Sequence, residues 1–181
     1  MKFEILGWES KGLRCPDINL SFKNEKSIFP IVLIQMPNGT GKTTTLDLLR
    51  AAMTGEARYW DEATVKDLSR AHSNNAKGRF ELRLAVDNVP LTFELKINLL
   101  DGRIEYQTTS PSIGGIEHDW KPPVEIRRFL RKEFINLFIF NGELAKELMN
   151  PEESAAEDSI DALCQLDLLD SIDQKVNDHW E

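Results

Sequence analysis

The spacing of apolar residues predicts that the chain begins with strands. Apolar and polar residues alternate over residues 2–8 and 18–23, as in a half-buried strand. A continuous apolar run over 31–36 is typical of a strand that is covered on both faces. The first 36 residues are therefore expected to supply three strands.

A helix is predicted next, and after it the period returns to that of strands. Residues 43–53 carry apolar side chains at helical spacing, and Gly55 can end the helix. Residues 79–87 and 91–99 alternate again, and Asp101-Gly102 favours a tight turn into a further strand at 103–106. The pattern predicts an antiparallel meander that follows the helix, and then a proline-containing loop over 110–123.

The last third of the chain predicts two helices and one buried strand. Residues 124–132 read as a helix with a basic strip, which is either a solvated face or a contact surface for DNA, nucleotide or a partner. The apolar run 134–140 predicts a second strand covered on both faces. Residues 159–180 space their apolar side chains as an amphipathic helix, packed on the domain or starting a coiled coil. The basic strip consists of Arg127, Arg128, Arg131 and Lys132.

Composition is that of a soluble globular protein, and it separates an acidic tail from a neutral body. The 181 residues suit one domain or one domain with an appendage, and no apolar run approaches the roughly 20 residues of a membrane span. The first seven residues do not resemble a secretory signal, and Cys15 and Cys164 lack metal-type spacing. We therefore expect a cytoplasmic protein with no membrane partner.

The net charge of −8 is concentrated at the C-terminus, because residues 141–181 contain twelve acids and only two lysines. The preceding residues carry a net charge of +2. An overall acidic balance argues against the whole chain being a simple electrostatic DNA binder.

The strongest chemical signal is a phosphate-binding loop between the third strand and the helix. Strand, small-residue loop and helix start are the context that such a loop requires. Its backbone N–H groups and the positive end of the helix dipole would face the phosphates of ATP. Lys42 would reach the β- and γ-phosphates, and the Thr43 hydroxyl would complete a Mg²⁺ shell. The expected nucleotide-binding residues are Pro37, Asn38, Gly39, Thr40, Gly41, Lys42, Thr43 and Thr44.

The loop departs from the usual pattern at one position. In G-x-x-x-x-G-K-[ST] the first glycine would stand at position 36, where this chain has methionine. Met36 could narrow the loop, while Gly39 and Gly41 remain where the backbone must approach phosphate most closely. The plain alternative is a chance Gly-Thr-Gly-Lys-Thr in a surface turn.

The order of these elements resembles the N-terminal lobe of ABC-type ATPase heads of the structural-maintenance-of-chromosomes (SMC) group and its DNA-repair relatives. Bacterial DNA phosphorothioation and anti-phage defence ATPases are similar variants. The resemblance rests on the loop 37–44, on 137–144, and more weakly on Gly12–Cys15 followed by Ile18–Leu20. It implies an α/β fold, with a P-loop NTPase lobe of ABC type over 1–150 and an acidic helix over 151–181 that starts a coiled coil.

The resemblance also implies roles for two further residues. Asn141 stands where the family has a glutamine that contacts Mg²⁺ and the attacking water. The resemblance therefore implies Lys42 and Asn141 as catalytic residues, and Thr43 and Asn141 as metal ligands. Asn141 is one methylene shorter, which favours a water-bridged contact, and a plain turn is the alternative. Arg14 would lie near the nucleotide, stacking on the base or contacting phosphate, unless it is an ordinary surface arginine.

Members of that family complete the head with a second lobe, which carries a signature motif and the Walker B acids. The sequence has no apolar run ending in Asp-Glu. We therefore expect an incomplete head, either truncated or one piece of a split ATPase. Its partners would be a C-terminal lobe or second head, and DNA through the full assembly.

Two alternatives come from other classes of protein. One is a small P-loop kinase, against which the meander counts because kinases usually alternate helices with parallel strands. The other is a non-hydrolysing module in which ATP orders a surface for a partner. A GTPase is disfavoured, since no Asn-Lys-x-Asp stretch occurs.

Overall fold

The computed structural model describes residues 2–24, 27–71, 73, 75–136, 138 and 139. The chain divides into two compact units, Met1–Pro123 and Val124–Glu181, and each is described by itself. Among the described residues no helix is long and apolar enough to span a membrane.

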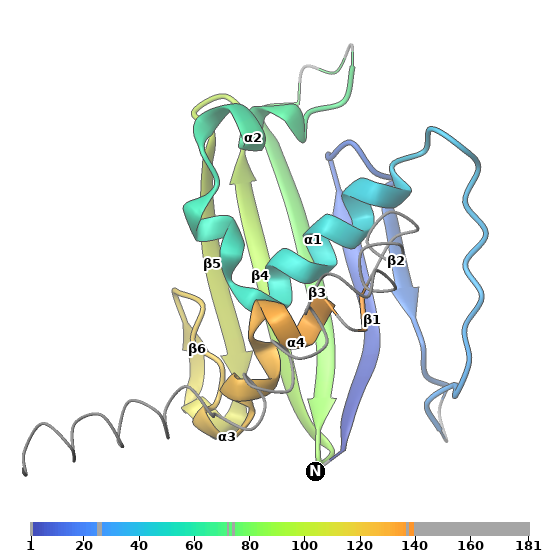
Figure 1. Ribbon diagram of the computed structural model, residues 1–181, viewed down its shortest axis with the longest axis vertical. Helices are drawn as coiled ribbons and strands as arrows, with labels where there is room; N and C mark the ends of the chain where they lie inside the picture. Colours follow the sequence, from blue (N-terminus) through green and yellow to red (C-terminus); the bar gives the residue numbers. More distant parts are fainter. Residues whose placement is uncertain (1, 25–26, 72, 74, 137, 140–181) are drawn as a thin grey trace, which may run out of the picture. The chain divides into compact units, whose positions relative to one another are not determined.

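The described part of the first unit is built on an antiparallel sheet of six strands (Figure 1). The order across the sheet is β2-β1-β3-β4-β5-β6, so the N-terminal strand lies between β2 and the meander. The meander predicted after the helix is confirmed in β3, β4 and β5. The strands are β1 (Phe3–Lys11), β2 (Ile18–Ser21), β3 (Lys77–Val86), β4 (Val89–Asn98), β5 (Arg103–Ser110) and β6 (Gly115–Glu117).

The core lies between one face of this sheet and the helix α1 (Lys42–Thr54), which crosses the sheet in Figure 1. Alternate residues of β3 and β4 point to this face and are buried, as the period of two requires. The helix predicted over 43–53 is confirmed, and Gly55 ends it with a φ of 75°. The largest buried side chains include Phe80, Leu82, Leu84, Phe93, Leu95, Ile97, Leu48 and Met53.

Short elements connect and flank these layers. The turn between β3 and β4 is made by Asp87 and Asn88, which both have positive φ, as in a two-residue hairpin turn. The proline-containing loop holds one short turn and the edge strand β6. In the described part of the first unit, the remaining elements are η1 (Glu56–Tyr59), α2 (Glu62–Asp67) and η2 (Pro111–Ile113).

The strand predicted over 31–36 is wrong. Residues 31–37 have no regular secondary structure, and they lead from β2 to α1 outside the sheet (Figure 1). Ile31 is 88% exposed and Leu33 is 93% exposed. A strand that is apolar on both sides needs neighbouring strands and two covered faces. Among the described residues no strand pairs with this segment.

The second unit corrects two further predictions. The helix predicted over 124–132 consists of α3 (Val124–Arg127) and η3 (Arg128–Leu130), and it ends before Arg131, which is extended with a ψ of 147°. The strand predicted over 134–140 is wrong for 134–136, which belong to α4 (Lys132–Asn136). In this arrangement the rings of Phe129 and Phe134 pack edge to face at 5.6 Å. The predicted helix over 159–180 lies outside the described residues.

Candidate functional site

The loop before α1 turns through two glycines in left-handed conformations. Gly39 has a φ of 77° and Gly41 a φ of 86°, values that a residue with a Cβ adopts only with strain. The Thr40 hydroxyl donates to the Pro37 carbonyl at 2.7 Å and closes the turn. The N–H and the hydroxyl of Thr45 both donate to the Gly41 carbonyl at 2.9 Å. The loop is therefore fixed at both ends, and α1 begins directly after it.

Gly41 is also the point where this loop touches the segment after β1. A Cβ on Gly41 would lie 2.2 Å from the Arg14 carbonyl oxygen and 2.8 Å from the Cα of Cys15. Gly39, by contrast, has no neighbouring atom within 4 Å of such a Cβ. The first glycine thus lies against open space, and the second allows the loop to pack against the 12–15 backbone.

Lys42 curls back over the loop it follows. Its ammonium donates to the Met36 and Pro37 carbonyls at 3.1 and 3.2 Å, and to Asn38 Oδ1 at 2.8 Å. Lys42 is exposed, so phosphate oxygens can replace these three acceptors of its ammonium without breaking a buried contact. The chain thereby places a lysine donor at the mouth of a loop that turns around it.

The N-terminus of α1 is suited to an anion. It has no side-chain cap and no acidic residue in its first turn, so its first N–H groups are free of a competing carboxylate. The Thr43 side chain is exposed there, while Thr44 is only 5% exposed and belongs to the core. These residues fit a triphosphate with its Mg²⁺, with Thr43 rather than Thr44 supplying the hydroxyl.

Arg70, which the sequence did not single out, holds the segment behind the loop. Its guanidinium donates to the carbonyls of Leu13 and Cys15, the latter at 2.7 Å, and pairs with the Asp17 carboxylate. Gly12 N–H donates to the same carboxylate at 2.7 Å. Residues 12–17 therefore form a loop whose shape depends on one arginine from the connection after α2.

Arg14 lies in this loop with its main chain against Gly41 and its side chain turned toward α2. The Arg14 guanidinium pairs with the Asp67 carboxylate at 2.8 Å, and the Arg14 N–H donates to the Leu68 carbonyl at 2.7 Å. The predicted contact of the Arg14 side chain with the base or with phosphate stays a prediction.

Cys15 is buried behind the same loop. Burial raises the pKa of its thiol above the ordinary value, against smaller opposing effects of hydrogen bonds with Ser10 and Thr45. A raised pKa keeps the thiol protonated at neutral pH, which makes it a packing group rather than a nucleophile.

The structure therefore brings together Arg14, Asn38, Gly39, Gly41 and Lys42, with Pro37, Thr40, Thr43 and Thr44 in the same loop and helix start. Met36 contributes its carbonyl to Lys42. Asn141 lies outside the described residues, so its predicted place beside the γ-phosphate stays a prediction.

Comparison with known proteins gives one finding for this chain. A family model described as an AAA domain matches residues 11–178, which is most of the chain and includes the whole loop. The comparison with curated proteins found no match. The chain therefore belongs to the AAA domain family, whose P-loop ATPase domains generally bind ATP with Mg²⁺.

Proposed function

We propose that this chain is the ATP-binding N-terminal half of an SMC-like ATPase head. Together with a C-terminal lobe, on the same or another polypeptide, it would couple Mg-ATP binding and hydrolysis to the handling of DNA in repair or defence. The observation that carries the nucleotide part is the loop at 37–41, with its two left-handed glycines, opening onto an uncapped helix and a lysine held at its mouth.

The chain's own groups would bind and orient the triphosphate. Lys42 would exchange its three oxygen partners for β- and γ-phosphate oxygens, and the N–H groups at the start of α1 would donate to the β-phosphate. Thr43 would hold Mg²⁺, which when bound neutralises charge on the transferring phosphoryl group. Asn141 would lie near the γ-phosphate. A general base and a signature motif would come from the second lobe or second head.

The proposed second lobe is supported by apolar surface beside the loop. Ile31 and Leu33 are almost fully exposed, and Phe29 and Val32 are also exposed. Four exposed apolar side chains in five residues are unusual for a surface segment, and they suit a strand that acquires neighbours in a larger assembly. The segment leads directly into the phosphate-binding loop, so such pairing would also position that loop.

The kinase alternative fits the fold less well. A six-stranded antiparallel sheet on which α1 packs differs from the alternating helices and parallel strands of small P-loop kinases. Transfer of phosphate from ATP to a nucleoside or metabolite by this chain alone would favour that alternative. A lack of ATPase gain on adding a C-terminal lobe would favour the non-hydrolysing module.

The first test is titration of Mg-ATP into the wild type and Lys42→Ala. Loss of the ammonium removes charged hydrogen bonds to phosphate that contribute about 1.5–3 kcal/mol, so affinity should fall roughly ten- to a hundredfold. Lys23→Ala is the control, because it removes an equal charge from an exposed site outside the loop. Equal affinities of Lys42→Ala and wild type for Mg-ATP would contradict the assignment of residues 37–44 as a phosphate-binding loop.

A second test asks whether the apolar segment is surface in this chain alone. Ile31→Ser and Leu33→Ser together should change the free energy of unfolding by no more than about 0.5 kcal/mol, as for exposed positions. Leu82→Ser and Leu84→Ser in the buried face of β3 should cost several times more, about 2–5 kcal/mol each. Urea denaturation followed by circular dichroism measures both. A large loss from the 31/33 pair would show that the segment is already packed, and it would no longer support a second lobe.

A further inference from the structure

The C-terminal end of α1 is held by two aromatic side chains that lie far from it in the sequence. The Tyr106 hydroxyl, on β5, donates to the Ala51 carbonyl at 2.8 Å, beside the Gly55 N–H that ends the helix on the same oxygen. The indole N–H of Trp120, in the segment after β6, donates to the Met53 carbonyl at 3.1 Å. The last carbonyls of a helix lack partners within the helix, so the indole satisfies a group that α1 itself leaves open. We call Tyr106 and Trp120 the aromatic clamp.

The indole of Trp120 is itself fixed by its neighbours. The buried ring of Phe93 stacks on it with 6.3 Å between the ring centroids and 24° between the planes. The guanidinium of Arg58 lies 5.1 Å from the indole centroid. A Cβ on Gly55 would lie 2.5 Å from the indole ring, so the glycine allows this close approach. The indole N–H therefore has a defined position relative to the sheet.

The backbone that carries the aromatic clamp is bonded to β5. The buried hydroxyl of Thr108 donates to the Asp119 carbonyl at 2.7 Å and accepts from the Lys121 N–H at 3.0 Å. Tyr106 precedes Thr108 by two residues on the same strand, and its oxygen also accepts from the Ala57 N–H at 3.2 Å. Burial raises the pKa of the Tyr106 hydroxyl, which therefore stays protonated and able to donate at neutral pH. Both donors are thus tied to one strand of the sheet.

The aromatic clamp supplies what the apolar packing of α1 lacks. Burial of apolar side chains such as Leu48 has no preferred direction, so it tolerates sliding of the helix along its own axis. Hydrogen bonds weaken steeply when their distance or angle changes, so two of them at one end fix the axial position. The helix has 13 residues and is therefore roughly 20 Å long, with the phosphate-binding loop at one end and the clamp at the other.

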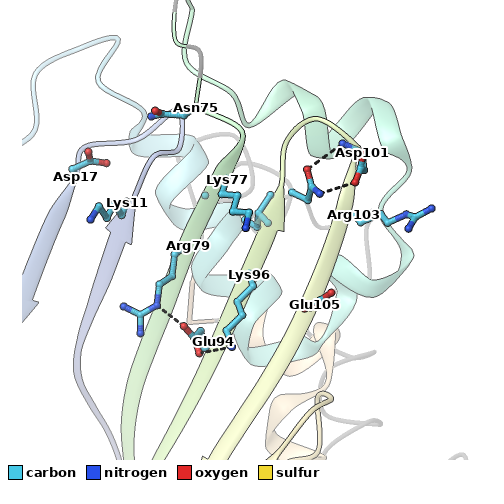
Figure 2. Close-up of a pocket in the computed structure, with 13 residues that line it drawn as sticks. Lys11, Asp17, Asn75, Lys77, Arg79, Glu94, Lys96, Asp101, Arg103 and Glu105 are labelled. Atoms are coloured by element: carbon cyan, nitrogen blue, oxygen red, sulfur yellow. Dashed lines mark hydrogen bonds and ion pairs between the residues drawn. The ribbon is translucent and has the colours of Figure 1, made fainter.

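The other face of the sheet does not hold α1. Figure 2 shows this face, where charged side chains line a cleft of about 850 Å³ and α1 lies behind the strands. The contacts there join strand residues to one another, as Arg79 with Glu94, or stay within a turn, as Asn98 with Asp101. These contacts stabilise the sheet, and the position of α1 on its inner face depends on groups such as the clamp.

We propose that Trp120 and Tyr106 are positioning residues for Mg-ATP. By fixing the end of α1 they set where Lys42 and the first N–H groups of the helix meet the phosphates. Coupling between two sites is mutual, so bound Mg-ATP must also act on the clamp. The proposal rests on the proposed binding of ATP at 37–44, and it adds residues that lie outside the phosphate-binding motif.

The first readout is the affinity of the folded protein for Mg-ATP. Trp120→Phe keeps an aromatic ring but loses the N–H, and Tyr106→Phe loses only the hydroxyl. Each should lower the affinity about five- to tenfold in isothermal titration of the full chain, at a temperature where circular dichroism shows every variant to be folded. Phe22→Leu is the control, because it weakens the edge-to-face contact with Trp8 and removes no donor to α1. It should lose stability and keep the affinity of wild type.

The second readout is the indole resonance of Trp120 in a proton–nitrogen correlation NMR spectrum. The resonance is identified by its loss in Trp120→Phe. Saturating Mg-ATP should move it in wild type, and the same concentration of Mg-ATP should leave it nearly in place in Lys42→Ala. A clamp that only stabilises the fold would not respond to a nucleotide at the opposite end of α1.

The outcomes separate this proposal from the proposed function. If wild type binds Mg-ATP but both clamp variants bind it equally well, or the indole resonance does not move, the positioning role is wrong and the phosphate-binding loop stands. A loss of affinity in Phe22→Leu as large as in the clamp variants would show that affinity follows general stability, which also overturns the positioning role. A wild type that does not bind Mg-ATP overturns the proposed function and this role with it.

Discussion

Gly41→Ala is expected to abolish measurable Mg-ATP binding and to lower the free energy of unfolding by more than Gly39→Ala does. Both glycines have φ near 80°, so a new Cβ brings the same backbone strain of about 1–2 kcal/mol at either position. At Gly41 the added Cβ would also lie 2.2 Å from the Arg14 carbonyl oxygen. Both groups are fixed to the main chain, so relieving this clash requires a shift of the backbone. The loop must then leave the 12–15 segment, and α1 would no longer begin at Lys42.

The difference between the two variants isolates this contact from backbone strain. Isothermal titration with Mg-ATP gives the affinity, and urea denaturation gives the stability. Gly39→Ala should keep weakened but measurable nucleotide binding, because nothing lies within 4 Å of the added methyl. Equal behaviour of the two variants would show that the packing of Gly41 on the 12–15 backbone does not shape the site.

Local pattern was enough to predict the elements whose partners are near in sequence. The meander of β3, β4 and β5 has alternating residues and short turns, so its register follows from the chain itself. The helix α1 has its own apolar stripe, and Gly55 ends it as predicted. The position of β1 beside β3 rests on pairs that are 68 (Lys11 and Arg79) to 83 (Phe3 and Val86) residues apart, and no local pattern in the sequence predicts such pairing.

The two continuous apolar runs were assigned wrongly for one physical reason. A run such as 31–36 predicts burial on both sides but says nothing of what buries it. In the structure Ile31 and Leu33 stay exposed, and 134–136 form part of α4 instead of a strand. The 31–36 run lacks a partner surface among the described residues, whereas Ile135 of the second run is buried from a helix without strand neighbours.

The part of the candidate site that is continuous in sequence was predictable. Residues 37–44 form one loop and one helix start, and their residue types alone indicate phosphate binding. Arg70 escaped notice because it lies in a polar connection with no motif, and its importance comes from reaching back more than fifty residues to the carbonyls of Leu13 and Cys15. Asp17 stands directly before β2, and nothing in the local sequence indicates its pairing with Arg70.

Arg70→Ala should cost about 2–3 kcal/mol of stability and weaken Mg-ATP binding, although Arg70 belongs neither to the phosphate-binding loop nor to α1. The change removes charged hydrogen bonds to two carbonyls and a carboxylate, and it leaves all three acceptors without that donor. The 12–17 loop then loses the group that fixes its shape, and Gly41 loses the surface on which it packs. Affinity for Mg-ATP should fall because the backbone around Gly41 shifts when the 12–17 loop loses its shape.

Two further variants separate this positioning role from charge and from general surface loss. Arg70→Lys keeps the charge but not the planar fork, so it should recover only part of the stability and of the affinity. Arg14→Ala breaks one exposed ion pair with Asp67 and should cost no more than about 1 kcal/mol. Denaturation and Mg-ATP titration of all three variants give the comparison. If Arg70→Ala loses stability but binds Mg-ATP like wild type, then the 12–17 loop supports the fold without shaping the phosphate-binding loop, and the contact at Gly41 is packing alone.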